Sequence, residues 1–115
     1  MQMKAALLVG NPRDEEEDDL ALLCCQGPNG ETLLLSRAPD EEDVEVIWDE
    51  DVTLVQGLKV TLGARRLLIA FPADAQAPFS DDLFEADLSG ALVDTEEVEQ
   101  ALRVILQGTG TLVME

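Results

Sequence analysis

Residues 20–36 read "LALLCCQGPNGETLLLS", and this segment decides the fold class. Two apolar runs, at 20–25 and 31–36, flank the sequence "QGPNG". Pro fixes one backbone angle, and Asn and Gly accept left-handed conformations, so this combination favours a tight turn. Two apolar runs joined by such a turn predict an antiparallel β-hairpin.

Other segments alternate between apolar and polar residues or form short apolar runs, which is typical of strands. The predicted strands occupy residues 4–10, 44–50, 58–63, 67–72 and 83–90. The "GARR" sequence between 58–63 and 67–72 predicts a second hairpin, and residues 73–82, rich in Ala, Pro and Asp, are expected to form a loop. We expect 4–10 to be buried on both faces, because Leu7, Leu8 and Val9 are consecutive.

The period of the apolar pattern changes near the end of the chain. Between Asp94 and Gln107 the apolar residues recur at spacings of three and four, which predicts one amphipathic helix with a cap at Asp94 or Thr95 and an end near Gly108. Strands followed by a helix indicate an α+β fold. We therefore expect an antiparallel β-sheet built from hairpins, with one C-terminal amphipathic helix packed on one face. A length of 115 residues fits a single domain, 1–115.

The chain carries 25 acidic and 7 basic residues, a formal net charge of −18. Such a charge repels nucleic acids and anionic lipid surfaces, whose binding depends on clustered Lys and Arg. It favours a cationic partner and a salt-sensitive encounter. The sequence therefore predicts a protein partner, and neither nucleic acid nor membrane.

The start of the chain, "MQMKAALLVG", does not have the pattern of a signal peptide, and no apolar stretch approaches the roughly 20 residues that cross a bilayer. We expect a cytoplasmic protein. Cys24 and Cys25 are adjacent, so they point to opposite faces of their strand. A disulfide between neighbours is strained, which predicts two free thiols.

Candidate catalytic groups are few. The chain has no His and no Tyr, which rules out Ser–His and Cys–His pairs within it, and glycine-rich phosphate motifs are absent. The acidic segments 14–19, 40–43 and 49–51 lack the ligand spacing of a calcium-binding loop. We predict no catalytic residue, no cofactor and no metal site. A carboxylate enzyme or a weak calcium binder is the least favoured class.

Acidic residues at strand ends are the best candidates for partner contacts, because a partner can reach them there. We assign this role to two clusters: Asp40, Glu41, Glu42 and Asp43 in one loop, and Asp49, Glu50 and Asp51 after a strand. The run "DEEEDD" at 14–19 is interpreted as a source of long-range field rather than of specific contacts. The acidic loops are expected to converge at one end of the sheet.

Six segments between Leu33 and Leu106 follow one another in a distinctive order. They are "LLLSR", "VIWDED", "GLKVTL", "LLIAFP", "LFEADL" and "VEQALRVIL". This order resembles that of a family of bacterial immunity proteins, the tenth immunity-protein family of polymorphic toxin systems. The resemblance implies a non-enzymatic cytoplasmic protein that neutralises a cognate basic toxin by direct binding.

Two functions from different classes therefore remain. The leading hypothesis is an immunity protein that binds a basic toxin through an acidic surface. The alternative is a small acidic structural or assembly domain without a toxin partner, whose charge serves solubility. The sequence also allows a homo-oligomer, and a stable one that buries the acidic end would favour the alternative, because it leaves no free docking surface.

Overall fold

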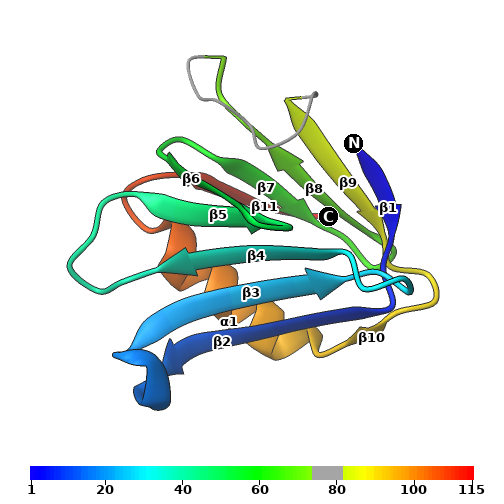
Figure 1. Cartoon of the computed structure of the whole chain (residues 1–115), viewed down its shortest axis with the longest axis horizontal. Coiled ribbons are helices and arrows are strands. Elements are labelled where there is room, and N and C mark those ends of the chain that lie inside the picture. Colours follow the sequence, from blue (N-terminus) through cyan, green and yellow to red (C-terminus); the bar gives the residue numbers. More distant parts are fainter. Residues whose placement is uncertain (74–81) are drawn as a thin grey trace.

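The strands form two sheets in the computed structural model, which describes residues 1–73 and 82–115 (Figure 1). The first sheet has six strands in the order β10-β2-β3-β4-β5-β6. Their bounds are Leu92–Val93 for β10, Leu7–Asp14 for β2, Leu20–Gln26 for β3, Thr32–Arg37 for β4, Val44–Trp48 for β5 and Asp51–Val55 for β6. From β2 to β6 each strand pairs antiparallel with the next one along the chain.

The second sheet has five strands in the order β1-β9-β8-β7-β11. Their bounds are Gln2–Lys4 for β1, Leu83–Asp87 for β9, Arg66–Ala70 for β8, Lys59–Leu62 for β7 and Thr111–Met114 for β11. The chain crosses between the sheets at Ala5 and Ala6, whose consecutive N–H groups donate to Asp87 of one sheet and Gln26 of the other.

The helix α1 (Thr95–Leu106) lies across the six-stranded sheet, behind β2 and β3 in Figure 1. The Asp94 carboxylate accepts a hydrogen bond from the N–H of Glu97, which caps the first turn. The apolar stripe of α1 is buried, as the spacing predicts, and it consists of Val98, Ala101, Leu102, Ile105 and Leu106. The helix packs closely on β2 because Gly10 has no side chain at the contact.

One continuous apolar core fills the space between the two sheets and the helix. The inner face of the five-stranded sheet carries the row Val60, Ile69 and Phe84, all fully buried. From the six-stranded sheet, the Trp48 ring meets the Phe84 ring edge to face, with their centroids 6.1 Å apart. Val44, Val46 and Trp48, which alternate along 44–50, thus form the inward side of β5.

The α+β class is confirmed, and the helix forms where the spacing predicts it. The strand pairs β3–β4 and β7–β8 are antiparallel, in agreement with the two predicted hairpin positions. The strands, however, form two sheets, and three of the pairings are parallel: β1 with β9, β10 with β2, and β11 with β7. The apolar segment 111–114 becomes the edge strand β11. Val9 is 41% exposed, so the expectation of burial on both faces of 4–10 was wrong there, because no described element covers its side of the sheet. Most of the predicted loop 73–82 lies outside the described residues.

Candidate protein-binding surface

Two of the acidic segments lie at the same end of the six-stranded sheet. Because β2 and β4 run in the same direction, the turn that follows β2 and the loop that follows β4 both emerge at the left in Figure 1. This end, hereafter the acidic end, consists of residues 14–19 with six carboxylates and residues 40–43 with four. The expected convergence of acidic loops is therefore found for these two segments.

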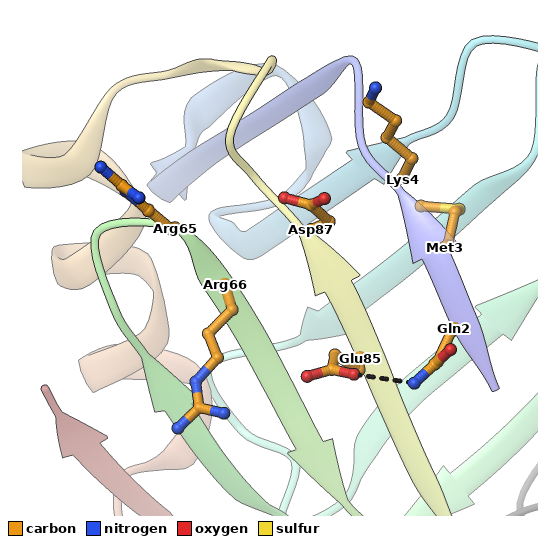
Figure 2. A pocket seen from close by; sticks show the side chains of 7 residues that line it. All are labelled: Gln2, Met3, Lys4, Arg65, Arg66, Glu85 and Asp87. Carbon is orange, nitrogen blue, oxygen red and sulfur yellow. Dashed lines mark hydrogen bonds between the residues drawn. The ribbon is translucent and has the colours of Figure 1, made fainter.

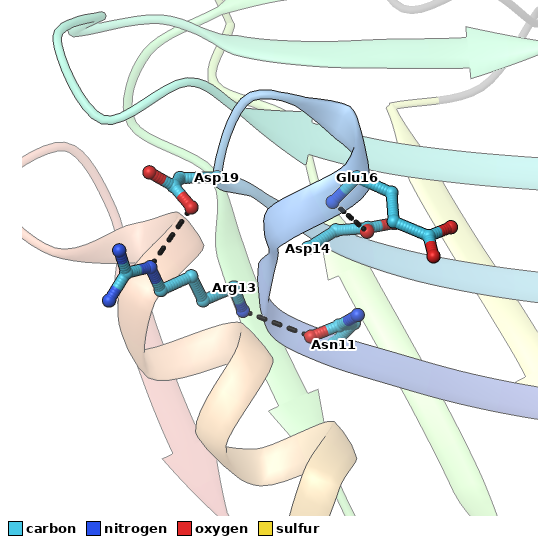
Figure 3. Close-up of polar contacts among 5 residues, drawn as sticks. All are labelled: Asn11, Arg13, Asp14, Glu16 and Asp19. Carbon is cyan, nitrogen blue, oxygen red and sulfur yellow. Dashed lines mark hydrogen bonds and ion pairs between the residues drawn. The ribbon is translucent and has the colours of Figure 1, made fainter.

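The turn at 14–19 has a defined local structure (Figure 3). Residues Glu15–Glu17 form one turn of 3₁₀ helix, and the Asp14 carboxylate caps it by accepting from the N–H of Glu16 at 3.1 Å. Asp18 and Asp19 then adopt left-handed backbone angles, which Asp tolerates better than most residues. Asp19 accepts from Nε of Arg13 at 3.0 Å. Asp14 and Asp19 thus shape the turn, while Glu15, Glu16 and Asp18 face solvent.

The C-terminus of α1 also lies at the acidic end, held by Arg37. The Arg37 guanidinium donates to the carbonyl oxygens of Glu41, at 2.9 Å, and Ile105, at 3.1 Å, and also to that of Gln107. The last carbonyls of a helix lack partners within the helix and carry partial negative charge, so a cation there stabilises them. In the sequence, Arg37 is marked only as an Arg at the end of an apolar run, a signal too common to indicate this role.

A pocket of about 730 Å³ opens beside this contact. Its lining consists of Pro12, Arg13, Asp19, Arg37, Ala38, Pro39, Val104 and Gln107. Both of its guanidinium groups already have internal partners, Asp19 for Arg13 and the helix carbonyls for Arg37. The surrounding carboxylates therefore dominate the charge that an approaching molecule meets.

The second predicted cluster, Asp49 to Asp51, lies at the opposite end of the same sheet. It forms the turn between β5 and β6, where Asp49 has a positive φ of 58°. At about 3.3 Å per residue, β5 separates Asp43 from Asp49 by roughly 20 Å. The structure therefore brings Asp40, Glu41, Glu42 and Asp43 together with residues 14–19, and it places Asp49, Glu50 and Asp51 elsewhere, near the turn that contains Glu31.

Basic residues gather on the other side of the molecule, on the outer face of the five-stranded sheet. Lys4, Arg65 and Arg66 line a pocket of about 440 Å³ together with Gln2, Met3, Glu85 and Asp87 (Figure 2). The N–H of Ser89 donates to the Asp87 carboxylate at 2.9 Å and lowers the pKa of Asp87 below its ordinary value of 3.8, and Lys4 adds to this shift. This face is mixed in sign, in contrast to the acidic end.

The two cysteines are free and differ in environment. Cys25 points into the core, where burial first and the neighbouring Cys24 second raise the pKa of its thiol to about 12. Cys24 is half-buried on the other face, and burial raises the pKa of its thiol as well. Among residues 1–73 and 82–115, no group of three or more His, Cys, Asp or Glu is placed to hold a metal ion. No helix of this part of the chain has the length and apolar character to span a membrane.

Comparisons of the chain with protein-family models, with curated proteins and with solved structures gave no significant match.

Proposed function

We propose that this protein is a non-enzymatic immunity protein that binds and neutralises a basic toxin through its acidic end. The concentration of carboxylates in residues 14–19 and 40–43 carries the proposal, because Arg13 and Arg37, the basic residues next to them, have internal partners. The order of segments between Leu33 and Leu106 supports the same class.

The negative charge of the acidic end mainly affects the rate at which the two proteins associate. Clustered charges of one sign attract an oppositely charged protein over about one Debye length, roughly 8–10 Å at physiological salt, and raise the association rate. The lasting complex also requires apolar contact at the centre of the interface. Neutralisation then follows from occlusion of the toxin's active surface.

The test expresses and purifies the products of the genes adjacent to that of this protein, and the proposal requires that one of them is a basic toxin. We expect a complex that inhibits the toxin and whose association rate falls steeply as salt is raised. The double variant Glu41→Gln, Glu42→Gln is expected to slow association about tenfold if each charge contributes about 0.7 kcal/mol, within the range measured for exposed ion pairs.

The matched control is Asp82→Asn, Glu85→Gln on the far sheet, which changes the net charge by the same amount. If both double variants slowed association equally, only the net charge would matter. The acidic end would then not be the binding site. Absence of binding to the toxin at low salt and micromolar concentration would contradict the function itself.

A further inference from the structure

The outer face of the six-stranded sheet carries an apolar row that the register aligns across five strands. Val9 is paired with Cys24, Cys24 with Leu34, Leu34 with Ile47, and Ile47 with Val52. Directly paired residues point to the same face of a sheet, so these five side chains form one continuous strip. Leu54, two residues after Val52, extends the strip along β6. These six residues define the outer apolar face.

No described element covers this face. Both α1 and the five-stranded sheet pack on the inner side, as the contact of Gly10 with Ala101 and that of Trp48 with Phe84 demonstrate. Val9 is 41% exposed, Val52 59% and Leu54 63%. Single exposed apolar residues are ordinary, but a contiguous strip on a soluble protein marks an interaction site.

Carboxylates border the strip on two sides and within it. The acidic end lies beyond one end of the strands, and Asp49, Glu50 and Asp51 lie beyond the other. Glu45 points to the same face as Leu54, its pairing partner. An apolar centre with a polar rim is the usual anatomy of a protein interface, and here carboxylates make up most of the rim, with the exposed Arg13 paired to Asp19 beside it.

The negative charge of the rim determines which kind of molecule can bind to the outer apolar face. A second copy of this chain would bring a rim of the same sign and a net charge of −18 against the first, which opposes face-to-face dimerisation. A partner with apolar side chains at its centre and Lys or Arg at its periphery complements both parts of the surface.

We propose that the outer apolar face is the docking surface for a basic protein partner, whose apolar side chains cover the strip while its Lys and Arg pair with the acids at both ends. This inference rests on the proposed function and names the contact surface. It assigns the two acidic clusters, which lie at opposite ends of β5, to the rim of one interface. Affinity then comes from the strip, and the rate of encounter comes from the rim.

Cys24 is a natural reporter for this surface because it lies within the strip and its thiol is free. The probe is a short synthetic β-hairpin peptide with valines on one face and lysines at both ends. Its control peptide has serines in place of the valines. We expect the valine peptide to bind about tenfold more tightly than the serine peptide and to slow alkylation of Cys24 by iodoacetamide to a similar degree.

Matched variants locate the contact. Leu54→Thr should abolish the advantage of the valine peptide, whereas Leu83→Thr, which alters an exposed leucine of the other sheet, should preserve it. Thr suits a strand, so both variants are expected to fold. Equal binding of the two peptides, or undiminished alkylation of Cys24 in the complex, would overturn the inference. So would a stable homodimer in which Cys24 is already protected without peptide.

The same readouts on the toxin complex separate this inference from the proposed function. A toxin that is neutralised while Cys24 stays reactive and Leu54→Thr binds normally leaves the function standing and refutes the docking surface. Docking of the valine peptide without neutralisation of the toxin refutes the function and retains the surface.

Discussion

Gly10 of β2 and Ala101 of α1 lie so close together that a Cβ atom on Gly10 would stand 2.9 Å from the Cβ of Ala101. The same atom would also be 2.9 Å from the carbonyl oxygen of Glu97 and from the Cα of Val98. Two of these three atoms belong to the helix backbone and cannot move without moving the helix. The absent side chain at Gly10 therefore sets the distance between the helix and the sheet.

Replacement of Gly10 by Ala is expected to lower the free energy of unfolding by about 1–3 kcal/mol, because overfilling a packed contact displaces its surroundings. Urea denaturation followed by circular dichroism measures the change. Gly90→Ala is the control, since the nearest atom to a Cβ there is the flexible end of Lys4 at 4.0 Å. Equal urea midpoints for Gly10→Ala and Gly90→Ala would refute the close contact between Gly10 and the helix.

Arg37 is expected to stabilise the end of α1 more than any ordinary surface charge. In Arg37→Gln the last carbonyls of the helix lose a cationic donor, at a cost of about 1–3 kcal/mol. Arg103→Gln, which breaks an exposed pair with Glu99 on the same helix, should cost only about 0.3–0.5 kcal/mol. The comparison of their urea midpoints tests the role of Arg37, and a smaller loss for Arg37→Gln than for Arg103→Gln would contradict it.

Glu115 is expected to titrate at unusually low pH. Arg66 donates two hydrogen bonds to its carboxylate, at 2.9 and 2.6 Å, and this contact lowers the pKa of Glu115 below its ordinary value of 4.5. Since the folded pKa lies below the unfolded one, the stabilising contribution is complete above pH 4.5 and is lost as the pH falls through the folded pKa.

An NMR titration of the Glu115 side chain measures this pKa directly. Arg66→Gln should return it towards 4.5, whereas Arg65→Gln, which alters the neighbouring cation in the turn, should leave it low. A pKa that stays unchanged in Arg66→Gln would show that the ion pair is not formed in solution.

The two thiols are expected to differ in reactivity, because the thiolate is the reacting form and both burial and a raised pKa suppress it. In the native protein at pH 8, iodoacetamide should modify Cys24 slowly and leave Cys25, with its pKa of about 12, intact. Mass spectrometry should find one modified site before unfolding and two in urea. Cys24→Ala should remove the native reaction, and modification of Cys25 in that variant would mean that the core opens readily.

The sequence predicted the local elements well because each depends on neighbours along the chain. The hairpin at 20–36 follows from its turn residues, and the helix follows from its apolar spacing and from Asp94. The inward side chains of β5, β7 and β9 follow from period-two alternation, which requires only that one face be buried.

The candidate surface was predicted only in part. Local charge identified the acidic segments, but it did not reveal that 14–19 and 40–43 share one end of the sheet while 49–51 lie at the other. That arrangement depends on the direction of each strand. The outer apolar face was also not predicted. Cys24 and Leu34 lie in continuous apolar runs, and Ile47 interrupts the alternation of 44–50, so no local pattern distinguishes the face that stays exposed.

The sequence by itself thus determined the class of fold, the hairpins, the helix and the excess of negative charge, because propensity, periodicity and composition are local properties. Only the tertiary structure decided how the strands divide into two sheets, since pairs such as Met3 with Ala86 and Leu112 with Val60 join residues that are distant along the chain. It also decided which apolar side chains remain in water. That choice depends on where the helix and the second sheet pack, and both pack on the same face of the six-stranded sheet.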